Sequence, residues 1–84
     1  MIVQNTANVA INLTITNCQT GSQDFSQSIQ PGASTSVSLT SDFTYNLEAN
    51  AIGTNPAVEY SIKADTDSVK LGYVNERISL NVSQ

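Results

Sequence analysis

Any acid–base chemistry in this chain has to use its carboxylates, because the sequence contains no histidine. The carboxylates are Asp24, Asp42, Glu48, Glu59, Asp65, Asp67 and Glu76. Glycoside hydrolysis needs two of them facing each other across a cleft. Glu48 and Glu59 fall on adjacent predicted strands and share a solvent face, but a flat polar face is not a cleft. We therefore predict that the protein is not an enzyme.

Nucleophilic catalysis lacks its usual base. Cys18 is the single cysteine, and no histidine is present to activate it or a serine. One cysteine cannot form an internal disulfide, so a disulfide-stapled secreted module is disfavoured. We predict a small, partly buried thiol beside a turn.

A metal site would have to use Asp65 and Asp67, which lie two residues apart in a turn-forming segment, 65–68. Carboxylate oxygens at this spacing can bind Ca²⁺. A full EF-hand loop also requires a glycine and a distant glutamate, and neither is correctly placed. We favour an Asx-type turn, with Ca²⁺ binding as the alternative, and predict no cofactor.

Aromatic side chains are the remaining candidates for recognition. Tyr45, Tyr60 and Tyr73 are in phase with apolar neighbours, which favours core positions with a hydroxyl at the rim over a sugar-stacking platform. Phe25 lies in a weakly alternating run, and Asp24 beside it is a candidate gatekeeper charge. We expect these five residues to contribute to any contact surface.

The charge balance excludes several classes of partner. Charged residues make up 12% of the chain, the net charge is −4, and the basic residues are Lys63, Lys70 and Arg77. Nucleic-acid binding and attachment to an anionic membrane both need a basic surface, so neither is expected. Ser, Thr, Asn and Gln provide 35 of the 84 residues. Such a surface suits contacts with other protein copies or with sugars, because few charges need desolvation.

No apolar run is long enough to span a bilayer, and the first residues do not show the pattern of a signal peptide. We expect no membrane insertion, and a location in a virion or at an extracellular surface.

Alternation with a period of two dominates the chain. The clearest runs are 9–15, 35–39, 43–51 and 58–64, and two further runs, 69–73 and 78–82, pair at the end. Segment 23–29 alternates poorly and is predicted to be an edge or irregular strand. No helical stripe is present. We predict one domain, residues 1–84, formed by an all-β antiparallel sandwich of seven strands, or eight if Ile2-Val3 joins, with a small barrel as the alternative.

Pro31-Gly32 has the chemistry of a type II turn, since Pro fixes a negative φ and Gly accepts a positive one. With the flanking segment 29–34 and the alternating residues after it, this turn resembles the strand, Pro-Gly turn, strand passages of bacterial and phage immunoglobulin-like sandwiches. The Cys…Trp…Cys core of true immunoglobulin domains is missing. The resemblance implies an immunoglobulin-like architecture and no functional residues. We predict a sandwich that is immunoglobulin-like or jelly-roll-like.

These observations favour a structural assembly protein, such as a small capsid, decoration or tail component of a phage virion, or a subunit of a surface appendage. We expect it to contact other protein subunits, as a homo-oligomer or in a larger assembly, through its polar strand faces and the edge near Phe25. The alternatives are a module that binds a carbohydrate or a protein, and an inhibitor that acts through its surface.

Overall fold

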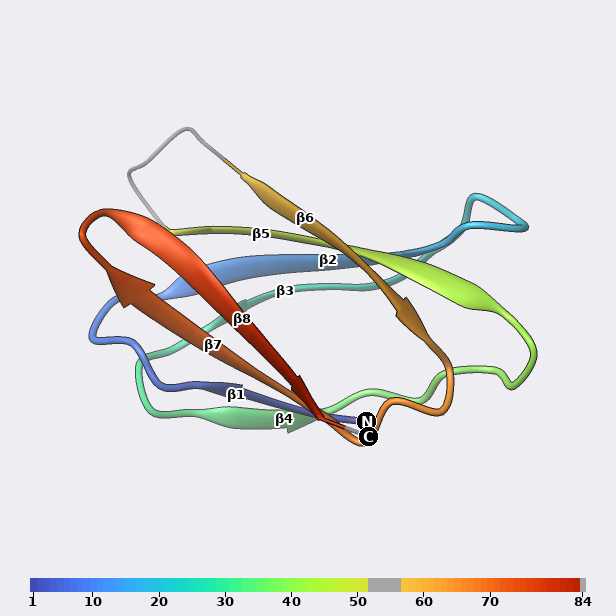
Figure 1. The fold of residues 1–84 in the computed structure, drawn as a ribbon, viewed down its shortest axis with the longest axis horizontal. Coiled ribbons are helices and arrows are strands. Elements are labelled where there is room, and N and C mark those ends of the chain that lie inside the picture. The colour runs from blue at the N-terminus through green and yellow to red at the C-terminus, as the bar shows by residue number, and fades with distance from the viewer. Residues whose placement is uncertain (52–56, 84) are drawn as a thin grey trace.

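The protein folds into eight β-strands in two four-stranded sheets, as described by a computed structural model for residues 1–51 and 57–83 (Figure 1). The strands are β1 (Ile2–Asn5), β2 (Ile11–Asn17), β3 (Gln23–Ile29), β4 (Ser34–Ser36), β5 (Thr44–Ala51), β6 (Val58–Lys63), β7 (Ser68–Val74) and β8 (Arg77–Ser83). The described residues include no helix, and so none long and apolar enough to cross a membrane. The all-β prediction is confirmed, and Ile2-Val3 does join a sheet as the eighth strand.

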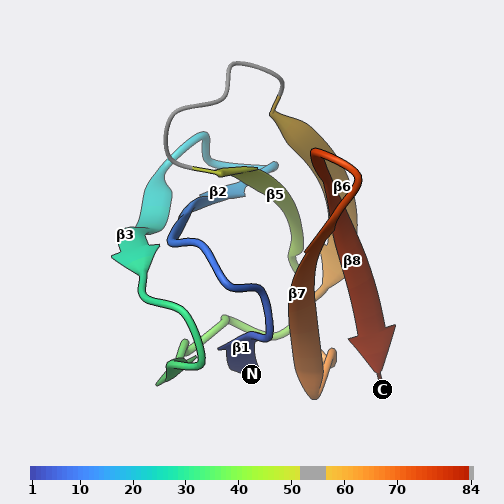
Figure 2. The same ribbon diagram turned by 90° about the vertical axis from the view of Figure 1, so that its left-hand side faces the viewer.

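The two sheets form two layers (Figure 2). The first sheet has the order β4-β1-β7-β8, and the second has the order β3-β2-β5-β6. Neighbouring strands are antiparallel except β1 and β7, which are parallel. The prediction of purely antiparallel sheets is therefore wrong for this pair. A parallel pair needs a long crossover, and here the chain between β1 and β7 builds the whole second sheet.

The core lies between the layers and is supplied by the alternating side chains of both sheets. Its fully buried members are Val3, Ile11, Leu13, Ile15, Tyr45, Leu47, Ala49, Val69 and Leu71. In β2 and β5 the buried positions alternate with exposed or half-buried ones, as expected when one face of a strand packs on a core. The period of two in the sequence therefore records real burial.

The strand β4 ends earlier than the sequence predicts. In the predicted run 35–39, regular pairing stops at Ser36, although Val37 remains buried. The Val37 carbonyl accepts a hydrogen bond of 2.9 Å from the amino group of Met1, and the Val37 N–H donates to the Met1 carbonyl. The chain then leaves the sheet to cross to the second layer (Figure 1).

The Pro31-Gly32 turn forms as predicted. Gly32 has φ of 77°, and the Ala33 N–H donates to the Gln30 carbonyl at 3.0 Å. This is the hydrogen bond and the positive φ that a type II turn requires. Gly53 and Pro56 also predict a turn at 53–56. That segment lies outside the described residues.

A second turn, between β7 and β8, has two central residues with positive φ, Asn75 at 53° and Glu76 at 61°. The hairpin closes with Val74 opposite Arg77, so this is a two-residue loop with type I′ geometry. Asn tolerates the left-handed region, but Glu is strained there. The favoured sequence would be Asn-Gly.

We predict that Glu76→Gly raises the free energy of unfolding by about 0.5–1 kcal/mol, because removing the strain outweighs the greater chain entropy of glycine. Urea denaturation monitored by circular dichroism measures this. Asn75→Gly is the matched control and should change stability less. A loss of stability in Glu76→Gly would contradict the assigned turn geometry.

Two buried asparagines stabilise the ends of strands, because their side chains form hydrogen bonds with backbone N–H and carbonyl groups. Asn5, fully buried at the end of β1, donates through Nδ2 to the carbonyls of Val9 and Ile29 and accepts the Ala7 N–H at Oδ1, each at 2.9 Å. Asn17, at the end of β2, accepts the N–H groups of Gln19 and Thr20 at Oδ1. Asn5 joins the two sheets, because β1 belongs to the first and Ile29 to the second.

Candidate interaction surfaces

The three tyrosines named by the sequence lie in different environments. Tyr45 is fully buried, and its hydroxyl oxygen accepts the Thr40 N–H at 2.9 Å. Tyr60, on the edge strand β6, is 46% exposed, and Tyr73 is half-buried on β7 in the other sheet. The tyrosines therefore form no common stacking platform, and Tyr45 has a core position that no external partner reaches in this fold.

Asp24 and Phe25 lie on β3, an edge strand of the second sheet. The register between β2 and β3 shifts by one residue next to the pair formed by Phe25 and Ile15. The prediction of an irregular edge strand is therefore confirmed. Phe25 is half-buried and packs against the core, whereas Asp24 is exposed and its Oδ1 accepts the Ser22 hydroxyl at 2.8 Å. A charge beside an edge limits unwanted strand pairing.

The turn at Asp65 and Asp67 is closed by backbone hydrogen bonds. The Thr66 N–H donates to the Lys63 carbonyl at 3.1 Å, and the Asp67 N–H donates to the Ser83 carbonyl at 3.0 Å. Across residues 1–51 and 57–83, no group of three or more His, Cys, Asp or Glu side chains could hold a metal ion. Cys18, predicted to be partly buried, is exposed.

Thr66 lies buried between the two aspartates, and its hydroxyl has no hydrogen-bond partner among residues 1–51 and 57–83. An unpaired buried hydroxyl costs about 1–3 kcal/mol. We predict that Thr66→Val, which keeps the side-chain shape, raises the free energy of unfolding by about 1 kcal/mol, measured by urea denaturation.

Thr6→Val is the matched control, because the Thr6 hydroxyl donates to the Leu71 carbonyl at 2.8 Å. The same chemical change should destabilise the protein there. Equal effects at the two positions would contradict the difference in hydrogen bonding.

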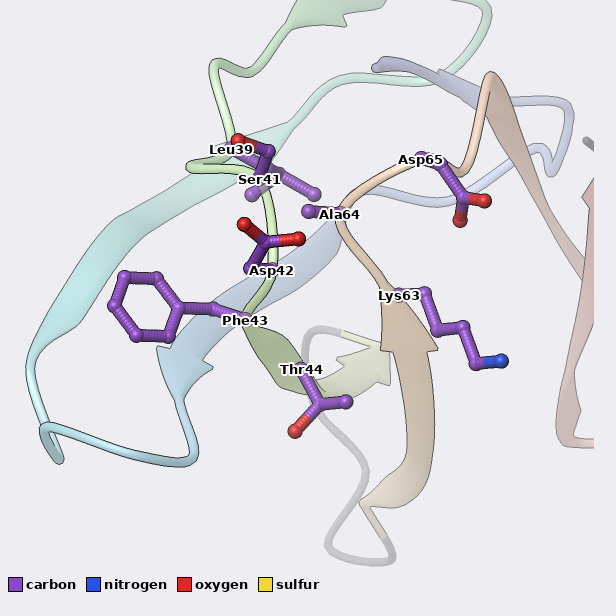
Figure 3. A pocket seen from close by; sticks show the side chains of 8 residues that line it. All are labelled: Leu39, Ser41, Asp42, Phe43, Thr44, Lys63, Ala64 and Asp65. Atoms are coloured by element: carbon purple, nitrogen blue, oxygen red, sulfur yellow. The ribbon is translucent and has the colours of Figure 1, made fainter.

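An open hollow of about 420 Å³ lies where the chain enters β5 and leaves β6 (Figure 3). Its lining residues are Leu39, Ser41, Asp42, Phe43, Thr44, Lys63, Ala64 and Asp65. It offers one ammonium, two carboxylates and two hydroxyls, but no imidazole or thiol. This set can form hydrogen bonds and ion pairs with a polar ligand.

The outward side of the first sheet carries basic residues. Val69 and Leu71 are buried, so Lys70 between them points away from the core. Arg77 is exposed and lies opposite Val74 on the same side. The other outward residues of the four strands are Ile2, Gln4, Ser34, Ser36, Ser68, Gly72, Ser79, Asn81 and Ser83. We call this surface the basic face, since the outward residues described for β1, β4, β7 and β8 include two cations and no carboxylate.

The basic face also exposes apolar side chains. Ile2 is 48% exposed beside Ser68, and Val74 is 66% exposed at the other end of β7. The two side chains lie at opposite ends of β7, and single exposed apolar residues of this kind are normal on a protein surface.

The outward side of the second sheet has the opposite charge. Glu48 lies directly opposite Glu59 on β6, and both point away from the core. Their neighbours on this side are Asn12, Thr14, Thr16, Ser26, Ser28, Asn46, Asn50, Ser61 and Lys63. Lys63 is opposite Thr44, about 13 Å along β6 from Glu59. We call this surface the acidic face.

Together, these features define a two-sheet all-β domain with flat polar faces of opposite charge. Comparison of the chain with protein-family models, curated proteins and solved structures gives no match. The sequence predicted that Glu48 and Glu59 share a face, and their register agrees. The predicted pairing of the runs 69–73 and 78–82 is also confirmed, and it brings Lys70 and Arg77 to the same face.

Proposed function

We propose that the protein is a non-enzymatic structural subunit that works through protein–protein contacts, as a small capsid, decoration or tail component of a virion or as part of a surface appendage. The observation that carries this proposal is the opposite charge of the two outer faces. The basic face of one copy is complementary to the acidic face of the next. Contacts of this kind are heterologous, so they propagate into rings or filaments.

The acidic face has a physical reason to accept a cation. Carboxylates directly opposite each other on neighbouring strands repel, and this repulsion destabilises the sheet. Lys70 from a second copy would relieve the repulsion between Glu48 and Glu59. The surrounding hydroxyl and amide groups can hydrogen-bond across the contact, and few further charges need to be desolvated.

Within this proposal the two layers form an immunoglobulin-like or jelly-roll-like sandwich. Eight strands in two sheets match the strand number of a jelly roll. The parallel β1–β7 pair departs from the antiparallel sheets of immunoglobulin domains.

Sugar binding is the second candidate, and the exposure of Tyr60 favours it. An aromatic ring at an accessible edge can stack on a sugar ring. Glycan-array binding that survives Tyr60→Ala would contradict this alternative.

Sedimentation velocity over a range of protein concentrations tests the assembly proposal. At low ionic strength we expect the sedimentation coefficient to rise with concentration. At about 1 M salt, where the screening length falls to about 3 Å, this rise should be strongly reduced. A sedimentation coefficient with the same concentration dependence at low and high salt would contradict assembly through the charged faces.

A further inference from the structure

The edge strand β8 lacks the features that protect the other sheet edges. β4 has three residues, β3 carries Asp24 and a register shift, and β6 carries Glu59 and Lys63. β8 has seven residues in regular pairing with β7, and beyond Arg77 it contains no charge and no proline. Proteins normally protect a long regular edge from pairing with another chain. An unprotected edge is therefore a site for strand addition.

We propose that β8 pairs antiparallel with β8 of a second copy, so that two first sheets become one continuous sheet. This contact rests on the proposed assembly function and names the partner as a second copy of the chain. It uses a sheet edge, which stays free when the faces of two copies stack. The register centred on Leu80 pairs the whole strand with itself. Ile78 then lies opposite Val82 of the second copy, and Leu80 lies opposite its own equivalent.

This register suits the apolar side of β8. Ile78, Leu80 and Val82 are half-buried and pack against the core of their own copy. Pairing places the same three side chains of the second copy next to them. Water is thereby removed from apolar surface that the isolated edge leaves partly exposed.

The charges at the ends of β8 are also complementary in this register. Arg77 lies opposite Ser83 of the second copy, and the Ser83 carbonyl accepts the N–H of Asp67 in its own chain. Each guanidinium therefore approaches the end of the sheet at which the other copy carries Asp65 and Asp67, both exposed. Two symmetric attractions result, and no like charges face each other along the strand.

The test uses sedimentation velocity at about 1 M salt, where stacking of the faces is screened. We expect the unmodified protein to form dimers that dissociate on dilution. Ser79→Lys combined with Asn81→Lys places two pairs of lysines opposite each other across the two-fold axis. It should weaken dimerisation by about twofold or more, because salt at this concentration screens part of the repulsion. Ser26→Lys with Ser28→Lys, at the same spacing on β3, is the matched control and should leave the dimer unchanged.

Disulfide trapping provides a second readout that does not depend on tolerance of the lysines. In a Cys18→Ser background, Ser79→Cys with Asn81→Cys should yield covalent dimers on mild oxidation, and Ser26→Cys with Ser28→Cys should not. A monomer at high salt together with no trapped dimer would overturn β8 pairing. Salt-sensitive association at low ionic strength would still support stacking of the faces, so the two proposals fail separately.

Discussion

Replacement of Tyr45 by alanine is expected to lower the free energy of unfolding by about 3–5 kcal/mol, a large part of the stability of an 84-residue domain. The change empties a fully buried position between Asn17 on β2 and Ile62 on β6. It also leaves the Thr40 N–H without the hydroxyl that accepts it. Both effects act in the same direction.

Urea denaturation of Tyr45→Ala and Tyr60→Ala compares the stability lost at a buried tyrosine with the stability lost at an exposed one. Tyr60 is 46% exposed, so its replacement should cost about 1 kcal/mol or less. Tyr45→Phe isolates the lost hydrogen bond and should cost about 1 kcal/mol. Similar losses for Tyr45→Ala and Tyr60→Ala would contradict the burial of Tyr45.

Replacement of Asn5 by alanine is expected to cost about 2–4 kcal/mol, because it leaves several backbone groups without their partner. The carbonyls of Val9 and Ile29 lose a donor, and the Ala7 N–H loses its acceptor. The bond to Ile29 is buried, so water cannot easily replace it. The substitution should mainly weaken the contact between the two sheets, because the hydrogen bond from Asn5 to Ile29 joins them.

Thermal and urea unfolding of Asn5→Ala measure this cost, and Asn8→Ala is the matched control. Asn8 is an exposed asparagine in the same loop, so its replacement should change stability by less than about 0.5 kcal/mol. A loss below about 1 kcal/mol for Asn5→Ala would show that its hydrogen bonds do not hold the sheets together.

Alternation predicted most of the strands because burial on one face of a sheet leaves a direct record in the sequence. β2, β5, β7 and β8 all follow it. The weak pattern around Phe25 agrees with the exposure of β3, in which only Phe25 and Ile29 are half-buried or buried. The end of β4 was not predictable, since Val37 stays buried after strand pairing stops.

The buried asparagines and the sorting of charge depend on contacts distant in sequence. Asn5 resembles a turn residue when its neighbours alone are considered, yet its amide reaches Ile29 on another sheet. The sequence predicted that Glu48 and Glu59 share a face, but alternation alone does not fix the register between β5 and β6 that places them directly opposite each other.

The proposed assembly is tested most directly by exchanging charge between the two faces. Lys70→Glu makes the basic face more acidic, and Glu48→Lys with Glu59→Lys makes the acidic face basic. Each variant alone should lose its salt-sensitive association, because the charge complementarity between its faces is weakened or removed. Mixed in equal amounts, the two variants should associate, since complementary faces are again present. Sedimentation velocity at low ionic strength should therefore show faster-sedimenting species in the mixture than in either variant alone. Unchanged association of the separate variants, or a mixture that sediments like its components, would contradict assembly through these faces.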